Sequence, residues 1–486
     1  MGDDIFMSQF STLLKKFLAR RKMSSRELSR LCHLDPGSLN QITNGRRPLN
    51  NDEVLDRIIK NLNLSPNDVD ALKEAYKISQ IGEDVYAKYK VIQDFLRSLN
   101  DIYQIPNDKS IEFLISAQAP FTVASNHSAV QKLMLHVFSN ALHHGENIRM
   151  ILQPDYHFLF DIFQSLNLDE TSSVIEHIIC YNNTEASGFA QNITYTKCVF
   201  KCCAASLNYR PYYYSGINHE RFDGMSLFPF MIVSDTHAVL LSSDYQQAIC
   251  LTDTEQVSLL QCHFDELLKS CHEVANVAIN LASALSTGIN NFYQYSANSD
   301  LSLSITFCFT PFLTAPIVRT YLNPQIPNFE DACMAIEKHS AQLRTMFHSS
   351  PFHVICDYEG VKDFFKTGSI REYPPGFLRD NLGIEARQNI IRQLLTAIQQ
   401  GWYEVILLRP NAKILDNNWT MCAKSGNVQF LSMYNNYYLQ FTLDEPATAS
   451  AITNFLSYLI TSDYCFSKEE SVAQLYKWAE EYCGMT

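Results

Sequence analysis

The fold at the N-terminal end of the chain is set by residues 23–49, MSSRELSRLCHLDPGSLNQITNGRRPL. Leu28, Leu31 and Cys32 recur at helical spacing after a pair of serines that can cap a helix. Asp35 is suited to cap a second helix, because its carboxylate accepts hydrogen bonds from the free backbone N–H groups of the first turn. The stretch therefore predicts two short helices joined by a tight turn.

The second helix of the pair is expected to run from Pro36 to about Thr43. Proline suits the first helical position, where its missing N–H group leaves no bond unmade. Leu39 and Ile42 lie three residues apart and face a core, and the helix stops before Gly45. The residues left on the outer side of this helix are Gly37, Ser38, Asn40 and Gln41.

Charge is distributed unevenly along the chain. Its 486 residues carry 38 Lys and Arg against 51 Asp and Glu, a net charge of −13 that disfavours a nucleic-acid partner for the molecule as a whole. Residues 1–65 nevertheless hold eleven Lys and Arg against seven Asp and Glu, which leaves 27 against 44 in the remainder. Any surface that binds phosphate is therefore expected within the first 65 residues.

Length and composition bound the class of protein. A chain of this length with 46% hydrophobic and 18% charged residues predicts two or three folded domains. The acidic start, MGDDIF, lacks the features of a signal peptide, and none of the apolar runs reaches the roughly 18 residues that span a bilayer. The fourteen cysteines then indicate thiols in a reducing compartment, so we expect a cytoplasmic protein without membrane contact.

Residues 6–72 resemble the repressor-type (Cro/C1, Xre-like) helix-turn-helix family of phage and bacterial transcriptional regulators. The pattern extends from the two short helices into LDRIIKNLNLSPNDVDAL, which starts at Leu55. Its matching positions in and just after the helix pair are Ser25, Leu28, Ser29, Leu39, Ile42, Gly45, Arg46 and Arg47. The resemblance implies that double-stranded DNA is the partner and that the second helix of the pair reads it.

The resemblance also implies which residues touch DNA. Ser38 and Gln41 match the family's base-contacting positions, Gly37 lies close to the groove, and the outward-facing Asn40 joins this set. The positions that match phosphate contacts are Ser25, Asn44, Arg46 and Arg47. Because Pro36 and Gly37 offer no side-chain donors, direct readout rests on few residues, with Gln41 against an adenine edge as the best candidate.

Two positions depart from the family's pattern. Ser25 stands where the family often has Gln, and His33 stands where it often has Gly. A histidine is tolerable in the turn between the two helices only if its backbone can adopt a left-handed conformation.

A helical pattern continues from residue 65 to residue 100, with a break near Gly82. Such a connector commonly carries dimerisation in regulators of this type, because two reading heads about one DNA turn, roughly 34 Å, apart bind a palindrome far more tightly than one head. The alternative is that the helix packs on its own C-terminal region.

The region after residue 105 mixes strand-like and helix-like stretches and contains an internal similarity. Residues 141–155, ALHHGENIRMILQPD, align without gaps with residues 397–411, AIQQGWYEVILLRPN. Both predict a helix end, a glycine turn and a buried strand, and each is followed later by a strand hairpin and a helix. A duplicated α/β unit is the economical explanation.

This arrangement resembles the two-lobed fold of the phospholipase D superfamily, in which each half carries the motif HxKxxxxD. Where the first half should carry that motif, Phe228 and Phe230 stand in place of the nucleophilic His and the phosphate-binding Lys, and only Asp235 matches. The second half has no His after His353. A mechanism that needs two imidazoles is therefore not supplied, and the resemblance implies a non-catalytic region.

Two further groups of residues are candidate sites. Cys198, Cys202 and Cys203 lack a second ligand pair at short range, so buried thiols are favoured over a metal site, and we expect neither a metal nor a cofactor. A dense tyrosine-rich segment could line a pocket for an anionic or aromatic effector, although a packed loop over a sheet explains it as well. Its candidate residues are Tyr209, Arg210, Tyr212, Tyr213, Tyr214, His219 and Arg221.

The sequence as a whole predicts an all-α helix-turn-helix domain followed by a large α/β region, possibly two duplicated phospholipase D-like lobes. We expect the helix-turn-helix domain at 1–78, a helical connector at 79–104, and lobes at 105–285 and 286–486. The expected function is a sequence-specific transcriptional regulator, a repressor and homodimer, whose C-terminal sensor region binds an unknown small-molecule or protein effector. The alternative is an enzyme or effector whose helix-turn-helix domain only localises it or regulates its own gene.

Overall fold

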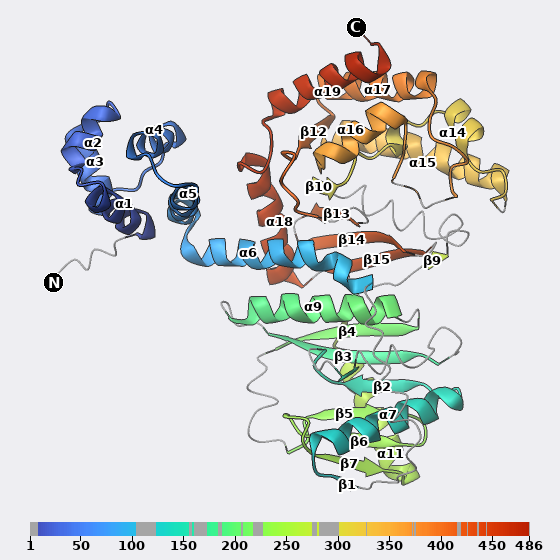
Figure 1. The fold of residues 1–486 in the computed structure, drawn as a ribbon. Helices are drawn as coiled ribbons and strands as arrows, with labels where there is room; N and C mark the ends of the chain where they lie inside the picture. Colours follow the sequence, from blue (N-terminus) through green and yellow to red (C-terminus); the bar gives the residue numbers. More distant parts are fainter. Residues whose placement is uncertain are drawn as a thin grey trace. The chain divides into compact units, whose positions relative to one another are not determined.

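The computed structural model describes residues 8–103, 123–154, 158–159, 173–182, 187–205, 208–216, 227–274, 279–280, 301–326, 328–371, 373, 376–415, 419–424, 426–434, 437–443 and 445–485. The chain divides into two compact units, Met1–Val91 and Ile92–Thr486, whose folds are drawn in Figure 1. Among the described residues, no helix is long and apolar enough to cross a membrane.

The first unit is entirely helical, as the sequence predicts. Its elements are α1 (Gln9–Arg20), α2 (Ser25–Leu31), α3 (Pro36–Thr43), α4 (Asp52–Leu62), α5 (Pro66–Ile81) and the first part of α6 (Glu83–Arg97). A polar side chain caps the N-terminus of each of the first five helices by accepting a backbone N–H bond; these caps are Ser8, Ser24, Asp35, Asn51 and Ser65. The helices bury one shared core that includes Phe10, Leu14, Leu28, Leu39, Ile58 and Leu72.

The first sheet of the second unit has the strand order β1-β7-β6-β5-β2-β3-β4-β8. Its strands are β1 (Val123–Ala124), β2 (Ile148–Ile151), β3 (Ile175–Asn182), β4 (Tyr209–Gly216), β5 (Phe230–Val233), β6 (Ala238–Leu241), β7 (Ala248–Leu251) and β8 (His272–Glu273). The helices that accompany them are α7 (His127–His143), α9 (Ser187–Ala205) and α11 (Thr254–Leu268).

The second sheet has the order β12-β11-β10-β13-β14-β15-β9. Its strands are β9 (Ile279–Asn280), β10 (Leu301–Ser304), β11 (Phe352–Cys356), β12 (Tyr403–Leu407), β13 (Trp419–Lys424), β14 (Asn427–Tyr434) and β15 (Tyr437–Leu443). The helical segments of this part are η1 (Ser98–Tyr103), which continues α6, and then η5 (Thr310–Phe312), α14 (Ala315–Tyr321), α15 (Phe329–Ser349), α16 (Tyr358–Thr367), α17 (Ile384–Gln400), α18 (Pro446–Thr461) and α19 (Lys468–Cys483).

Both sheets repeat one topology. In the first, β2, β3 and β4 are parallel, and the antiparallel strands β5, β6 and β7 extend the sheet from β2 before α11 follows. In the second, β10, β11 and β12 are parallel, and β13, β14 and β15 extend the sheet from β10 before α18 follows. The predicted two-part α/β region, with a strand hairpin and a helix at the end of each part, is confirmed.

The predicted alignment of residues 141–155 with residues 397–411 is wrong in topology. It pairs β2, the first parallel strand of its sheet, with β12, the third and outermost parallel strand of the other sheet. The two segments look alike because each ends a helix on a left-handed glycine, Gly145 (φ 70°) or Gly401 (φ 78°), and then enters a buried strand. This is a local requirement of helix-to-strand turns, so it recurs at positions that are not equivalent in the fold.

An aromatic cluster joins the two sheets of the second unit. Phe200 of α9, which lies between the sheets in Figure 1, stacks on Phe441 with ring centroids 3.9 Å apart and lies 6.2 Å from Trp419 and 5.4 Å from Phe430. Phe95 of α6 lies 6.1 Å from Phe200 and 5.7 Å from Phe430. The C-terminal half of α6 is therefore packed into the C-terminal region, which is the second of the two arrangements that the sequence allows for the connector.

A buried histidine ties the parallel strands of the first sheet together, and its titration gives a test of the packing within that sheet. His177 of β3 donates its Nε2 proton to the Leu152 carbonyl oxygen (3.0 Å), and its Nδ1 accepts from the Tyr209 hydroxyl (2.6 Å), a tautomer that these two partners assign. Burial lowers the pKa of His177 to about 4. The folded protein therefore holds this imidazole neutral, whereas the unfolded chain binds a proton near pH 6.5.

We predict that the free energy of unfolding falls by up to about 3 kcal/mol as pH drops from about 6.5 to about 4, because only the unfolded state gains this proton. Urea unfolding at pH 7 and pH 4.5 measures the loss. It should shrink in His177→Gln and stay the same in the control His263→Gln, which replaces an exposed histidine. An equal loss in both variants would contradict the assignment.

Candidate nucleic-acid interface

The turn between α2 and α3 depends on a left-handed residue. After α2 ends, the Leu34 N–H donates to the Ser29 carbonyl oxygen (2.8 Å) and the His33 N–H donates to the Arg30 carbonyl oxygen (3.3 Å). This pair of bonds closes the helix with His33 at a φ of 54°. His33 therefore meets the condition that the sequence sets for a histidine at this position.

The start of α3 is fixed by a cap and a proline. Asp35 Oδ2 accepts a 2.7 Å hydrogen bond from the Ser38 N–H, and Pro36 takes the first helical position. A Cβ added at Gly37 would lie 3.0 Å from Asp35 Oδ2, so a larger residue there would press on the cap.

The end of α3 repeats the closure that ends α2. The Arg46 N–H donates to the Gln41 carbonyl oxygen (2.9 Å), and Gly45 is left-handed with a φ of 71°. Caps at both ends thus hold an eight-residue helix in one conformation.

The outer face of α3 presents the residues that the sequence predicts there. Leu39 and Ile42 are buried, whereas Gly37, Asn40 and Gln41 are exposed. Ser38 and Asn44 are half-buried. Asn44 Nδ2 donates to Asn40 Oδ1 (3.0 Å), so these two amides hold each other across one turn. The Gln41 amide has no hydrogen-bond partner within the described part of the chain, which leaves both its donor and its acceptor for another molecule.

The predicted phosphate contacts differ in accessibility. Arg46 and Arg47 follow α3 directly, are exposed, and form no ion pair or hydrogen bond through their side chains with any described residue. The Ser25 hydroxyl oxygen is buried and has no hydrogen-bond partner among the described residues. Ser25 is therefore a weaker candidate for a phosphate contact than the two exposed arginines.

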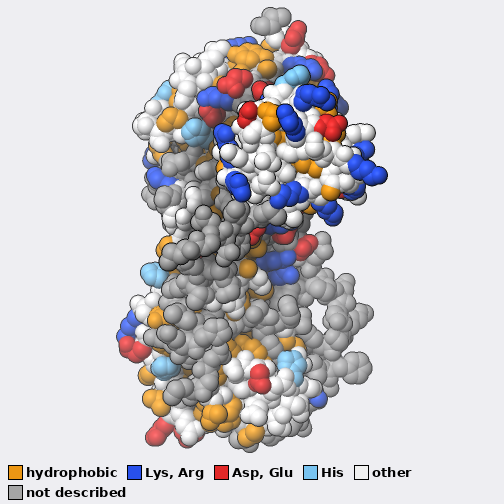
Figure 2. Space-filling view, turned by 90° about the vertical axis from the view of Figure 1, so that its left-hand side faces the viewer, with side chains coloured by type: hydrophobic (Ala, Val, Ile, Leu, Met, Phe, Trp, Pro, Cys, Tyr) orange, Lys and Arg blue, Asp and Glu red, His pale blue; other side chains and the backbone are white. Residues whose placement is uncertain are grey.

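Two further cations were missed by the sequence reasoning. Arg26 and Arg30 lie one turn apart on α2, are exposed, and have side chains without partners among the residues that the structure describes. Their spacing of four residues, which puts both side chains on one face of a helix, is the sequence signal that identifies them. The face of the helical unit seen in Figure 2 accordingly carries more Lys and Arg than Asp and Glu side chains.

Other basic side chains of this unit hold the fold together instead. Arg20 pairs with Asp68 at 2.5 Å, Arg57 donates to the Cys32 carbonyl oxygen at 3.1 Å, and Arg21 donates to the Asn63 carbonyl oxygen. The net charge of the domain therefore overstates the number of cationic side chains that are available to contact DNA.

The tyrosine-rich segment forms β4, and its side chains alternate between the two faces of the sheet. Tyr209 and Tyr213 are buried on one face, whereas Tyr212 and Tyr214 pack against a different core on the other. Arg210 falls on the same face as Tyr212 by this alternation, and His219 and Arg221 lie outside the described residues. The described residues of the segment are therefore not brought together around one pocket.

The structure places two of the cysteines and two of the expected motif positions in or beside buried elements. Burial raises the pKa of the Cys202 and Cys203 thiols well above the usual range, and no group of metal-ligating side chains occurs in the described ranges. Phe230 is buried in β5 and stacks on Tyr245 with centroids 5.0 Å apart. The Asp235 N–H donates to Glu146 Oε2 at 3.1 Å, which ties the end of β5 to the turn before β2.

Comparison with known proteins identifies the family of one domain of the chain. Residues 13–72 match the model of the Cro/C1-type helix-turn-helix DNA-binding domain. They therefore form such a domain, as the sequence predicts. No curated protein matches the chain.

Two solved structures are similar to the chain at low identity. Phosphatidylserine synthase from Haemophilus influenzae Rd KW20 is 11% identical, with a TM-score of 0.22, over 81% of this chain and 98% of the other. Polyphosphate kinase from Porphyromonas gingivalis is 9% identical, with a TM-score of 0.22, over 78% of this chain and 59% of the other. Similarities at this TM-score carry no argument about the activity of this chain.

The left-handed residue between α2 and α3 generates a prediction about stability. Replacing His33 by Gly should raise the free energy of opening α2 and α3 by about 0.5–1 kcal/mol, because glycine adopts a positive φ without steric cost. His33→Val should lower it by about 1–2 kcal/mol. Hydrogen exchange of the α2 and α3 amides in the full-length protein measures both changes.

The matched control is Arg30→Gly, one turn earlier in regular helix, where glycine should lower the free energy by about 1 kcal/mol. Destabilisation by glycine at both positions would show that the His33 backbone is not left-handed in solution.

Proposed function

We propose that this chain is a sequence-specific DNA-binding transcriptional regulator that acts as a repressor. The observation that carries the proposal is the exposed, doubly capped helix α3, whose Gln41 amide is uncommitted within the described structure. The match of residues 13–72 to a DNA-binding domain family supports it independently.

In the proposed complex, α3 enters the major groove with its outer face toward the base edges. Gln41 donates to N7 and accepts from the N6 amino group of one adenine, a bidentate pair worth about 1–3 kcal/mol of discrimination. Asn40 and Asn44 lie on the same side of the helix and are bonded to each other, so they add less to base reading than Gln41 does. Arg46 and Arg47 bind the adjacent phosphates and fix the register of the helix without reading sequence.

We propose further that the protein binds its operator as a homodimer. One head offers few base-reading side chains, since Gly37 has none and Asn40 is already bonded to Asn44. Two linked heads on a palindromic site raise the affinity without any new kind of contact. The acidic remainder of the chain, with 27 Lys and Arg against 44 Asp and Glu, keeps the C-terminal region away from the phosphates.

The C-terminal region is proposed to be a non-catalytic sensor that acts through α6. The packing of Phe95 against Phe200 of α9 and Phe430 of β14 supports this role, because one residue from each half of the region contacts this end of the helix. A ligand that changes the packing between the sheets would move α6. That movement would alter the preferred arrangement of the two helix-turn-helix domains in the dimer. Coupling of this kind is typically worth about 1–3 kcal/mol in DNA affinity.

The proposal predicts distinct effects for base-reading and phosphate-binding residues. On a duplex enriched from random sequence by the wild-type protein, Gln41→Ala should weaken binding by about 1–3 kcal/mol and leave non-specific binding unchanged. The double variant Arg46→Ala with Arg47→Ala should weaken both kinds of binding and reduce the salt slope by about two per head. Fluorescence anisotropy across a salt series measures both quantities.

The control removes two positive charges from the second unit, by Arg379→Ala with Lys477→Ala, and should leave affinity unchanged. The proposal fails if the wild type, Gln41→Ala and the double arginine variant bind the selected duplex equally well. It also fails if the wild type enriches no sequence.

A further inference from the structure

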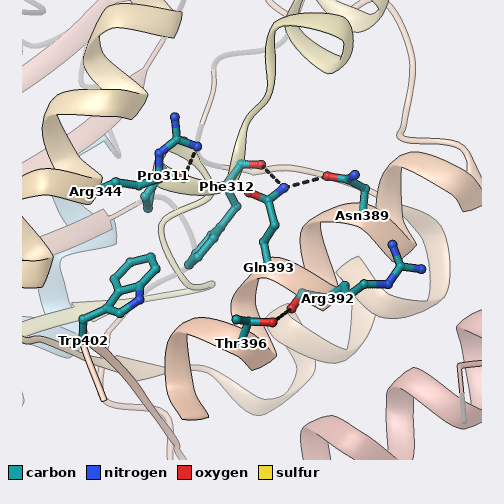
Figure 3. Close-up of a pocket in the computed structure, with 8 residues that line it drawn as sticks. All are labelled: Pro311, Phe312, Arg344, Asn389, Arg392, Gln393, Thr396 and Trp402. Carbon is teal, nitrogen blue, oxygen red and sulfur yellow. Dashed lines mark hydrogen bonds between the residues drawn. The ribbon is translucent and has the colours of Figure 1, made fainter. Parts of the chain in front are cut away.

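A pocket with an apolar and a polar side lies in the second half of the C-terminal region, between α15, α17 and the residues around η5 (Figure 3). Its volume is about 290 Å³, and it lies on other elements than the tyrosine-rich strand β4. We propose that this pocket binds a small organic anion, a carboxylate or a phosphate ester, that carries one planar apolar ring.

The apolar side of the pocket suits a planar ring. Phe312 and Trp402 line it, with ring centroids 5.9 Å apart and an angle of 30° between the rings. Trp402 is only 8% exposed, and its indole N–H donates to Gln400 Oε1 at 3.0 Å. The indole is thus fixed in place with its polar atom already bonded, and its exposed edge offers the pocket a small apolar surface, behind which Phe312 is buried.

The polar side of the pocket suits a negative charge. Arg344 and Arg392 both line it, and no acidic side chain does. Within the described part of the chain, the Arg344 guanidinium donates a long hydrogen bond of 3.4 Å to the Pro311 carbonyl oxygen. The Arg392 guanidinium has no hydrogen-bond or ion-pair partner within the described ranges.

A fixed amide network adds directional donors beside the two arginines. Gln393 Nε2 donates to the Phe312 carbonyl oxygen (3.0 Å) and to Asn389 Oδ1 (2.6 Å), as Figure 3 shows. Asn389 is therefore oriented, and its amide nitrogen has no hydrogen-bond partner among the described residues. The Thr396 hydroxyl donates to the Arg392 carbonyl oxygen at 2.8 Å.

This combination defines the class of ligand. Arginine forks and an amide N–H are the donors that carboxylate and phosphate oxygens prefer, while two aromatic side chains favour a ring over an aliphatic chain. A volume near the lower end of the range for small-molecule sites limits the ligand to about one ring. Free inorganic anions lack the part that Phe312 and Trp402 would cover.

Four probes of the full-length protein separate recognition of the ring from recognition of the negative charge. Benzoate and phenyl phosphate carry both a ring and a charge, benzyl alcohol carries only the ring, and inorganic phosphate carries only the charge. Binding is followed by tryptophan fluorescence and by calorimetry up to roughly 10 mM, which suits fragments of this size. At least one of the two aromatic anions should bind saturably, and about tenfold more tightly than benzyl alcohol and inorganic phosphate.

Variants locate the binding. Arg392→Gln and Arg344→Gln should each weaken the aromatic anion about tenfold, because each removes a charged donor. The control Arg379→Gln replaces an exposed arginine elsewhere in the same half of the region and should leave affinity unchanged. The proposal is overturned if neither aromatic anion binds, if benzyl alcohol binds as tightly, or if the pocket variants bind like the wild type.

The role of this pocket as the effector site rests on the proposed function, but its ligand class does not. Anisotropy of the selected duplex with and without the bound anion distinguishes the two. Anion binding in a protein that binds no DNA would sustain the pocket and overturn the proposed function. Anion binding that leaves an existing DNA affinity unchanged would sustain the pocket and overturn its role as effector site.

Discussion

The contact of Phe200 with Phe441, Trp419 and Phe430 is a central interaction of the C-terminal region, because it packs α9 of the first half against three strands of the second sheet. Phe95 enters the same cluster from α6. Aromatic pairs of this geometry are worth about 0.5–1.5 kcal/mol each beyond their buried area. The C-terminal end of α6 thus lies where both halves of the C-terminal region meet.

The DNA-binding domain depends on a different constraint, the left-handed backbone at His33. That single φ value directs the chain from α2 into α3, and the Asp35 cap and the Gly45 closure then fix the length of α3. With both ends fixed, Gln41 faces outward as an unbonded amide, while Arg46 and Arg47 emerge at the end of the helix. The exposed amide and the two exposed arginines therefore come from one short segment whose geometry is set by three local features.

The helical domain was predictable because its signals are local: caps, a proline at the first helical position and apolar spacing each act within a few residues. The two-part α/β region was predictable for the same reason, from its hairpins and helices. The register of the duplication was not, because the turns at Gly145 and Gly401 satisfy one local rule at positions that differ in the sheet order. The pocket beside Trp402 escaped prediction because Phe312, Arg344 and Arg392 come from segments that only the tertiary fold brings together.

The measurement that tests the central claim most directly is the sequence preference of the protein before and after a change at Gln41. Wild type and Gln41→Arg are each used to enrich duplexes from the same random pool, and the two enriched motifs are compared. The account predicts motifs that agree except at one position in each half-site, where adenine gives way to guanine, because glutamine pairs with adenine and arginine with guanine. Identical motifs, or a wild-type protein that enriches none, would contradict it.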